Sequence, residues 1–362
     1  MAKVLLLSPS FFSVGGIQHL MQAVVRHSEH DFDVVVRRSD YDADRAGAID
    51  ARVISTRLTL GRHYLTLGHL LAQTDYGALY ISSLKHADAA LVAAPFGTPV
   101  VCHTHGNDLF GRQTVDPVTR RLHRWGERYV ARYIAVSDWT GRQLTERGVE
   151  PSAVEVIPNG VDVSRFRNGR ADGLRAELGV PDDAFLLLTV ARLVPRKGHR
   201  LVLDALEQIE GARYVIVGTG PEEERLKERA RAAGIADRVV FAGYVSDEAL
   251  PRYYRACDAY VMPSRHLSED RSVEGFGLSF LEANAAGRVA IGTRTGGIPT
   301  AIRHEETGLL CEPTVRSVAD ALRRVMGDAD LRARMEAGAR DWAERHDWAQ
   351  IVPRIDRVLA GG

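Results

Sequence analysis

Two glutamates stand eight positions apart, with seven residues between them that begin with a glycine-rich turn. They are Glu274 and Glu282, and the turn is formed by residues 275–277, Gly-Phe-Gly. The glycines allow the backbone to turn tightly and to approach a ligand closely. We expect a helix to begin there, and a helix start offers N–H groups and a positive dipole end to an anion. Acidic residues near helix starts are also common capping partners, so the pair alone does not define a site.

Two cations follow an apolar run that we predict as a strand. Arg192 and Lys197 come directly after residues 186–191. Ligands of open α/β sheets bind at the carboxyl ends of the strands. Arginine offers a planar fork to phosphate oxygens and lysine a mobile point charge, so the two side chains together suit a diphosphate. We expect Arg196 and Arg200, in the same segment, to be solvated loop side chains.

Three further glycine pairs are predicted to form tight turns near a ligand: Gly15 and Gly16, Gly218 and Gly220, and Gly296 and Gly297. The first of these pairs follows the first predicted strand and opens a helix. It lacks the full G-x-G-x-x-G pattern, so a dinucleotide site is poorly supported.

Two histidines alternate along another predicted strand end. His103 and His105 are two residues apart, which places them on one face of a strand. A metal pair is conceivable on that face, but we find no third ligand with recognisable spacing. We therefore favour a hydrogen-bond donor role for one of the two.

The elements that must position these residues are short apolar strands alternating with helix-length segments. Ten continuous apolar runs are typical of strands buried in a parallel sheet: 4–7, 34–36, 79–82, 100–103, 134–136, 154–157, 186–191, 214–217, 239–242 and 260–262. The alternation restarts after the polar stretch 162–173. We therefore predict two Rossmann-like halves with a hinge near residues 160–175.

The composition is that of an ordinary globular protein. The 362 residues exceed what one hydrophobic core usually serves, and 45% are hydrophobic and 26% charged. Lys+Arg and Asp+Glu both total 47, so the net charge indicates no nucleic-acid partner. Three cysteines without a C-x-x-C pair favour neither a disulfide framework nor a zinc site. No apolar run approaches the ~18 residues of a membrane span, and we expect a cytoplasmic location.

Taken together, these motifs resemble the retaining family-4 glycosyltransferases over essentially the whole chain. The resemblance rests on the glycine pairs, on His105, on Arg192 with Lys197, and on the spacing of the two glutamates. It implies an α/β fold of the GT-B type, with two Rossmann-like doubly wound domains facing across a cleft. It also implies that the C-terminal helix crosses back to the N-terminal domain. Residues 1–165, with about 346–362, would bind the acceptor, and residues 170–345 the nucleotide-sugar donor.

The resemblance also implies roles for the charged residues. Arg192 and Lys197 would hold the donor diphosphate. Glu282 would bond the nucleotide ribose, and Glu274 the hydroxyls of the transferred sugar. The chain departs from the family pattern at Thr300 and at Arg288, which stand where many members have Glu and Pro. Neither position makes the contacts named here.

The remaining implied contacts come from both domains. His105 would reach the donor sugar and Gly16 the phosphate, both from the N-terminal domain. Further donor-binding positions are Gly218, Gly220, Phe276, Gly277 and Leu278, the last three with backbone groups.

The implied reaction is retaining transfer of a sugar from a nucleotide-diphosphate sugar to a hydroxyl acceptor, which could be a glycan, a lipid-linked molecule or a small molecule. We expect a front-face mechanism with no cofactor and no metal, because Arg192, Lys197 and a helix start already offset the leaving diphosphate. No Asp-x-Asp cluster stands at a predicted strand end. The nucleotide base, the sugar and the acceptor are not readable from the sequence.

Two alternatives stay open at this stage. A nucleotide-sugar epimerase or isomerase would use the same scaffold without an acceptor. A non-catalytic nucleotide-sugar-binding protein is disfavoured, because both glutamates, both cations and the histidine are present together.

A basic segment at 120–128 contains Trp125 and is interrupted by Glu127. It fits either a solvated helix or a helix at a membrane surface. We therefore add weak peripheral association with the inner face of the cell membrane as a possible interaction.

Overall fold

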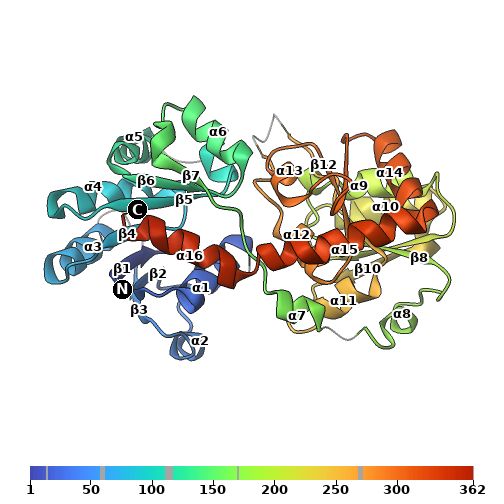
Figure 1. The fold of residues 1–362 in the computed structure, drawn as a ribbon, viewed down its shortest axis with the longest axis horizontal. Helices are drawn as coiled ribbons and strands as arrows, with labels where there is room; N and C mark the ends of the chain where they lie inside the picture. The colour runs from blue at the N-terminus through green and yellow to red at the C-terminus, as the bar shows by residue number, and fades with distance from the viewer. Residues whose placement is uncertain (14, 58–61, 111–116, 169–170, 268–271, 362) are drawn as a thin grey trace. The chain divides into compact units, whose positions relative to one another are not determined.

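The computed structural model describes residues 1–13, 15–57, 62–110, 117–168, 171–267 and 272–361. The chain divides into two compact units. The N-terminal unit comprises residues 1–160 with 348–362, and the C-terminal unit comprises residues 161–347. Each unit is built around its own parallel sheet (Figure 1). That each of these units has a separate role, acceptor binding or donor binding, stays a prediction.

The N-terminal unit contains a seven-stranded sheet in the order β3-β2-β1-β4-β5-β6-β7. All neighbouring strands are parallel. The chain runs outward from β1 to β3 and then returns to β4 beside β1, which makes the β1–β4 boundary the switch point of the sheet. The strands are β1 (Lys3–Leu7), β2 (Asp31–Arg37), β3 (Arg52–Thr56), β4 (Ala78–Ile81), β5 (Val100–Thr104), β6 (Arg132–Ala135) and β7 (Val154–Val156).

Helices cover both faces of this sheet, and the strands are apolar on both sides for that reason. In β1, Val4 and Leu6 enter one core and Leu5 and Leu7 the other. The helices are α1 (Gly16–His27), α2 (Ala43–Gly47), α3 (Arg62–Gln73), α4 (Ala90–Ala93), α5 (Pro117–Gly126), α6 (Asp138–Glu146) and α16 (Trp348–Leu359). Short 3-10 turns are η1 (Leu84–Ala89), η2 (Ala94–Phe96), η3 (Asn107–Phe110), η4 (Glu127–Tyr129) and η5 (Pro151–Ala153).

The last helix, α16, completes the N-terminal unit. Its apolar side chains share a buried core with those of α1 and β1. Asp356 on α16 accepts hydrogen bonds from the Ser28 hydroxyl, at 2.6 Å, and from the Glu29 N–H, at 3.1 Å. Gly160 lies against the Trp348 ring, where a Cβ would come within 2.4 Å. The predicted return of the C-terminal helix to the N-terminal unit is confirmed.

The C-terminal unit repeats the plan with a six-stranded parallel sheet in the order β10-β9-β8-β11-β12-β13. Its switch point lies between β8 and β11. The strands are β8 (Phe185–Val190), β9 (Ala212–Val217), β10 (Val239–Gly243), β11 (Ala259–Val261), β12 (Val289–Thr293) and β13 (Gly308–Cys311). The helices are α7 (Val163–Arg167), α8 (Leu174–Glu177), α9 (His199–Leu206), α10 (Glu223–Ala232), α11 (Leu250–Ala256), α12 (Leu278–Ala285), α13 (Ile298–Ala301), α14 (Val315–Gly327) and α15 (Ala329–Arg345), with 3-10 turns η6 (Pro195–Lys197) and η7 (Ala236–Arg238).

The predicted fold class, two Rossmann-like parallel sheets with helices, is confirmed. Each of the ten predicted strands is present, and β3, β12 and β13 are additional. α14 and α15 are separate helices, because Asp328 caps the second by accepting the Leu331 N–H at 2.8 Å. The hinge predicted near 160–175 includes residues 169–170, which lie outside the described residues. Within the described ranges, no helix is long and apolar enough to cross a membrane.

Candidate active site

A largely buried charge cluster of the C-terminal unit lies just beyond the carboxyl ends of β8 and β11. Arg196 Nη1 and Lys197 Nζ both donate to Glu274 Oε2, at 2.5 and 2.6 Å. The side chains are only 15, 14 and 12% exposed for Arg196, Lys197 and Glu274. We call these three residues the Glu274 triad. The triad adjoins the switch point of the sheet, where ligands of open α/β folds bind.

Close backbone packing fixes both sides of the Glu274 triad. Gly198 has φ +75°, and a Cβ there would lie 2.1 Å from the Pro263 carbonyl oxygen. The Arg265 N–H donates to the Arg196 carbonyl at 2.8 Å, which ties η6 to the loop after β11. The Gly297 N–H donates to the Glu274 carbonyl at 2.9 Å. The predicted turn at 296–297 therefore supports Glu274 directly.

The triad is charged at neutral pH. Burial acts to raise the pKa of Glu274, but the charges of Lys197 and Arg196 and their hydrogen bonds outweigh it and bring that pKa to about 2. Burial also lowers the pKa of Lys197, an effect that Glu274 opposes and the like charge of Arg196 reinforces. With two cations and one carboxylate, the triad carries a net positive charge.

Two expectations about the arginines of this segment have different outcomes. The expectation that Arg196 is a solvated loop side chain is wrong, because its guanidinium is buried against Glu274. Arg200 is solvated as expected, with a side chain 74% exposed. Arg192 is exposed, and none of the residues described by the structure forms an ion pair with it. It is close enough to Lys197 for its charge to lower the pKa of that lysine.

The glycine-rich turn after Glu274 starts α12, as predicted. Gly277 has φ +93°, and a Cβ there would meet the Phe280 ring at 2.6 Å. Phe276 is buried, so only its backbone can face a ligand, while Leu278 is the first residue of the helix. Glu282 lies one turn further on and accepts a hydrogen bond from the Tyr254 hydroxyl at 2.5 Å. Tyr254, on α11, thus orients the carboxylate that we predict to bind ribose.

Gly218 and Gly220 bring two loops of the sheet edge together. A Cβ on Gly218 would lie 2.1 Å from the Ala191 carbonyl oxygen, and one on Gly220 would lie 2.4 Å from that of Leu193. Leu193 N–H donates to the Thr219 carbonyl at 2.9 Å. These glycines therefore hold the segment that carries Arg192, whatever contact they make with a donor.

In the N-terminal unit, His105 lies just after β5. Its Nε2 is 2.9 Å from the Ser82 carbonyl oxygen, at the end of β4, and its backbone N–H donates to Asp108 at 2.9 Å. The rings of His103 and His105 stack with centroids 4.8 Å apart and 3° between their planes. The prediction that both lie on one face is confirmed.

The partners of the two histidines define their chemistry. Burial lowers the pKa of both His103 and His105, which keeps them neutral at pH 7. A carbonyl only accepts hydrogen bonds, so Nε2 of neutral His105 carries the proton and Nδ1 is an acceptor. The donor role that we expected is therefore already used on Ser82. His103 Nδ1 is engaged with the Tyr80 hydroxyl at 2.5 Å.

Gly16, the other N-terminal position predicted to meet the donor, is the exposed first residue of α1. Its neighbour Val14 lies outside the described residues. In the part of the chain that the structure describes, no three His, Cys, Asp or Glu side chains are grouped so that they could hold a metal ion. The expectation that no metal takes part stays a prediction.

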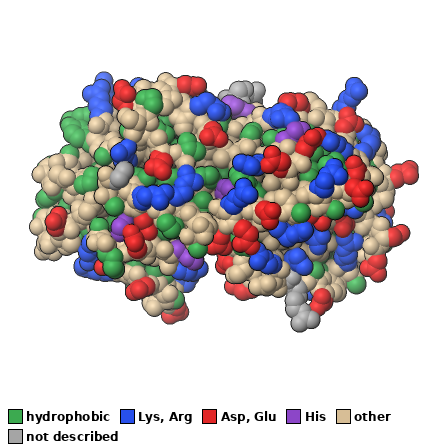
Figure 2. Space-filling model, viewed as in Figure 1, with side chains coloured by type: hydrophobic (Ala, Val, Ile, Leu, Met, Phe, Trp, Pro, Cys, Tyr) green, Lys and Arg blue, Asp and Glu red, His purple; other side chains and the backbone are tan. Residues whose placement is uncertain are grey.

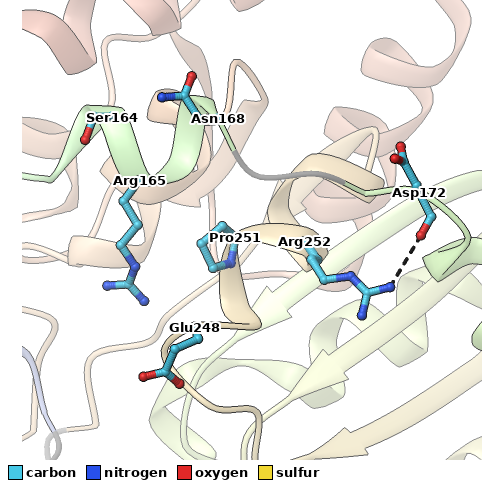
Figure 3. Close-up of a pocket in the computed structure, with 7 residues that line it drawn as sticks. All are labelled: Ser164, Arg165, Asn168, Asp172, Glu248, Pro251 and Arg252. Atoms are coloured by element: carbon cyan, nitrogen blue, oxygen red, sulfur yellow. Dashed lines mark hydrogen bonds between the residues drawn. The ribbon is translucent and has the colours of Figure 1, made fainter.

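A separate pocket of about 620 Å³ lies in the C-terminal unit, between α7 and α11 (Figure 3). Arg165 and Glu248 extend into the same open space, whereas Arg252 donates to the Asp172 carbonyl at 3.4 Å. The lining contains none of the predicted site residues: it comprises Ser164, Arg165, Asn168, Asp172, Glu248, Pro251 and Arg252. We therefore keep the sheet edge at the Glu274 triad as the candidate active site.

Sequence reasoning missed two positions that shape this site. Arg196 stands beside Lys197, but arginines in loops are usually solvated, and the sequence therefore predicts no role for it. Its neighbour's predicted role was the only signal that could have singled it out. Tyr254 is 28 residues before Glu282, and no spacing rule connects an aromatic residue on one helix with a carboxylate on another.

Comparison with known proteins agrees with the fold and the motifs. The family model "Glycosyltransferase Family 4" matches residues 15–165, and "Glycosyl transferases group 1" matches residues 171–342. A GDP-mannose-dependent alpha-(1-6)-phosphatidylinositol monomannoside mannosyltransferase of Mycobacterium tuberculosis is 33% identical over 307 residues, 81% of this chain and 78% of that protein. A D-inositol 3-phosphate glycosyltransferase of Saccharomonospora viridis is 34% identical over 286 residues, 72% of this chain and 64% of that protein.

Solved structures show the same fold at lower identity. Alr3699/HepE of Anabaena in complex with UDP-glucose superimposes with a TM-score of 0.84 at 21% identity, over 100% of both chains. The two family models together span both units, and the mycobacterial relative covers most of the chain. The chain belongs to the family-4 glycosyltransferases, enzymes of the GT-B fold that transfer a sugar from a nucleotide-sugar donor.

Proposed function

We propose that this enzyme transfers a hexose, with retention of anomeric configuration, from a nucleoside diphosphate sugar to a hydroxyl acceptor. The observation that carries the proposal is the Glu274 triad beside the exposed Arg192, at the start of α12. This arrangement offers positive charge to a diphosphate and a carboxylate to a sugar within one sheet edge.

The positive groups stabilise the leaving diphosphate. Cleavage of the glycosyl–phosphate bond develops positive charge on the sugar and negative charge on the leaving group. Lys197, Arg192 and the first N–H groups of α12 lie at one sheet edge, where positive groups can stabilise the charge of the leaving diphosphate. These groups suffice for a diphosphate, so we propose that no metal is needed.

Glu274 is better suited to binding the sugar than to moving a proton. A carboxylate with a pKa of about 2 is a weak base at neutral pH. Its Oε2 is occupied by the two cations, and no described residue donates to Oε1. We propose that Oε1 accepts a hydrogen bond from a sugar hydroxyl. The leaving diphosphate oxygen takes the proton of the acceptor on the same face of the sugar, which retains configuration.

His105 contributes an acceptor nitrogen from the N-terminal unit. Its Nε2 is held by the Ser82 carbonyl, and neutral Nδ1 is left to accept from a hydroxyl of the sugar. We propose that this contact forms in the donor complex and orients the sugar for attack.

The printed names of the relatives suggest the substrates to test first. The relatives named above use GDP-mannose with phosphatidylinositol mannoside, or act on D-inositol 3-phosphate. We propose GDP-mannose as the donor and an inositol-containing glycolipid as the acceptor of this enzyme, with UDP-glucose as the donor to compare.

The exposed side chains on and just after α5 support the proposal that this enzyme acts at a lipid bilayer. Val118, Trp125 and Tyr129 are exposed, Trp125 by 53%. Residues 117–129 contain four arginines and a single acidic residue, Glu127, which is paired with Arg147 at 3.1 Å. In the upper left of Figure 2, where Figure 1 draws α5, basic and hydrophobic side chains lie close together, with acidic ones among them. Exposed aromatic and basic side chains within one short segment suit an anionic bilayer, and we propose peripheral association there.

A direct assay tests the proposed reaction. Purified enzyme is incubated with GDP-mannose or UDP-glucose, in EDTA, with vesicles containing phosphatidylinositol or phosphatidylinositol mannosides. We expect a mannosylated lipid whose new linkage has the α configuration of the donor. A β-linked product would contradict retention, and activity that EDTA abolishes and one divalent metal restores would contradict the metal-independent chemistry.

The association with membranes is tested separately. Vesicles with and without anionic lipid are sedimented with the wild type and with Trp125→Ala and Arg124→Gln variants. We expect binding to anionic vesicles that both changes weaken and that rising salt weakens further. Equal binding by the wild type and both variants would exclude α5 as the contact surface.

A further inference from the structure

The Glu274 triad contains one more cation than the proposed reaction uses. Lys197 is assigned to the diphosphate and Glu274 to the sugar, but Arg196 has no substrate to bind. Both cations donate to the same carboxylate oxygen, Oε2, at 2.5 and 2.6 Å. That oxygen therefore has two positive partners, one more than it needs for charge balance.

We propose that Arg196 is a positioning residue: it holds Glu274 in place while Lys197 turns from Glu274 to the donor diphosphate. The inference rests on the proposed function, since it assumes that a diphosphate binds beside Glu274. Arg196, the second partner of Glu274, has this role only when the donor is bound.

Burial is the first reason. The side chain of Glu274 is 12% exposed, and a buried carboxylate that loses its counter-ion either takes up a proton or moves toward water. If Lys197 were the only partner, drawing it to a phosphate would release Glu274 at the moment when the sugar needs it. Because Arg196 remains on Oε2, the carboxylate keeps both its charge and its direction.

The side chains of Lys197 and Arg196 also differ in flexibility, and the proposal requires this difference. Lysine carries a point charge on a flexible four-carbon stem, whereas the guanidinium of arginine is a planar, pre-organised fork. The backbone of η6 is fixed by the Arg265 N–H on the Arg196 carbonyl at 2.8 Å and by the close approach of Gly198 to Pro263. Only the side chain of Lys197 has to turn.

Removal of Arg196 has a consequence for pH. The charged and titratable groups that act on Glu274 or its partners are Lys197 and Arg196 on η6, Arg192 before it, and Tyr260 on β11, which stays protonated because burial raises its pKa. Without Arg196, only Lys197 opposes the effect of burial, so the pKa of Glu274 rises from about 2. The acid limb of the turnover–pH profile should then move to higher pH.

The experiment compares Arg196→Gln and Arg196→Lys with the wild type, with Lys197→Ala, and with Arg200→Gln as the matched surface control. GDP and UDP affinities are measured by calorimetry, and consumption of GDP-mannose and UDP-glucose is measured from about pH 3 to 9, so that an acid limb raised from about pH 2 falls within the range. We expect Arg196→Gln to keep its affinity for the nucleoside diphosphate and to lose about 10- to 100-fold in kcat, because Glu274 is misplaced. Its acid limb should rise by about one pH unit or more.

The lysine variant separates positioning from folding. Arg196→Lys keeps a charge on Oε2, so we expect an acid limb close to that of the wild type and a kcat between those of the wild type and Arg196→Gln. Simple destabilisation could also raise the acid limb, so circular dichroism at each pH is used to confirm that both variants are folded where their rates are compared. If Arg196→Gln does not fold, the kcat and acid limb of Arg196→Lys decide the question.

Three outcomes would overturn the inference. They are wild-type kcat and pH profile in Arg196→Gln, the same loss in Arg200→Gln, or a loss of nucleoside diphosphate affinity equal to that of Lys197→Ala. The last would make Arg196 a phosphate ligand. A wild-type enzyme that consumes neither donor would instead refute the proposed function, and the two failures are thereby distinguished.

Discussion

The two units have parallel sheets of similar topology, but different side chains lie at the carboxyl ends of their strands. In the C-terminal unit, the edge is occupied by a buried cluster of charges, the Glu274 triad. In the N-terminal unit, the corresponding edge is occupied by two stacked, neutral histidines held by the ends of β4 and β5. One edge therefore presents charged side chains, and the other presents neutral imidazole rings.

The surfaces of the two units also differ, in the number of large hydrophobic side chains that they expose. Of the eight exposed large hydrophobic side chains among the described residues, only Tyr244 lies in the C-terminal unit. The other seven lie in the N-terminal unit, and Val118, Trp125 and Tyr129 gather on or just after α5. Under the proposed function, the charged edge would bind the anionic nucleotide and the exposed hydrophobic surface would face a lipid-linked acceptor. The comparison shows that two parallel sheets of similar topology can carry different side chains at their edges and different surfaces.

Among the substitutions that test this difference between the units, Lys197→Ala is expected to have the largest effect. Loss of a positioned cation at the leaving group should lower kcat by about 100- to 1000-fold. The affinity for GDP or UDP should fall by about 10- to 100-fold, because a charge-assisted hydrogen bond is lost. Calorimetry and initial rates measure both quantities. Arg200→Gln serves as the control, and unchanged nucleotide affinity in Lys197→Ala would remove the C-terminal edge as the diphosphate site.

The two glutamates sharpen the comparison within the C-terminal unit. Glu274→Ala should lower kcat by about 10- to 100-fold through the lost hydrogen bond to the sugar. It should not weaken nucleoside diphosphate binding, since it frees two cations. Glu282→Ala should weaken the nucleoside itself, and Tyr254→Phe should do so to a smaller extent. Calorimetry with GDP, UDP and the free nucleosides would show the opposite pattern if the two roles are exchanged.

A smaller effect is expected in the N-terminal unit. His105→Ala should lower kcat by about tenfold, through one lost neutral hydrogen bond to the sugar. It should leave GDP and UDP affinity unchanged, because no part of the nucleotide depends on it. His105→Asn is the informative companion, since its side chain can keep one polar contact. Nucleotide binding that falls with His105→Ala would contradict the division between the edges.

The smallest effect separates the units by their stability toward acid. His86, His103 and His105 of the N-terminal unit are neutral in the fold, because burial lowers their pKa values, to about 4 for His86. On unfolding they regain a pKa of about 6.5 and take up protons. Stability is therefore present above about pH 6.5 and is lost as the pH falls toward the lowered values.

The C-terminal unit should respond later to acid. Glu274 stays ionised in the fold until the pH approaches about 2, so its contribution is lost only below its unfolded pKa of 4.5. His199, with a pKa lowered to about 4 by burial, and His304 are its own sensitive histidines. We expect the N-terminal unit to lose on the order of 5 °C in Tm between pH 7 and 5, and the C-terminal unit less. Hydrogen exchange resolved by unit and followed through a temperature series at pH 7 and pH 5 measures both losses, and equal losses would contradict the comparison.

Much of the fold was predictable because buried parallel strands leave continuous apolar runs. The sequence pattern did not predict β3, β12 and β13, and there are physical reasons for this. β3 and β13 are edge strands, and β3 is only half buried, with the sequence Arg-Val-Ile-Ser-Thr. β12 lies inside its sheet, but small residues, Ala290 and Gly292, interrupt its apolar run because α12 and α13 pack closely against it.

The candidate site was predictable in its residue types but not in its pairings. The spacing of Arg192, Lys197, Glu274 and Glu282 predicts them as site residues. That Arg196 is buried, however, depends on how the loops after β8 and β11 press together, and such contacts between distant segments leave no local pattern. The tautomer of His105 likewise depends on the Ser82 carbonyl, 23 residues earlier.

The position of α16 in the N-terminal core also constrains the order in which the chain matures during synthesis. Translation delivers residues 1–160 first, yet their core still lacks Trp348, Ile351 and Ile355, which are made only after residues 161–347. The C-terminal unit, a continuous segment, has all its parts as soon as Asp347 has left the ribosome. The unit whose synthesis begins first is therefore completed second, and until α16 docks, apolar side chains of α1 lack the cover that α16 supplies.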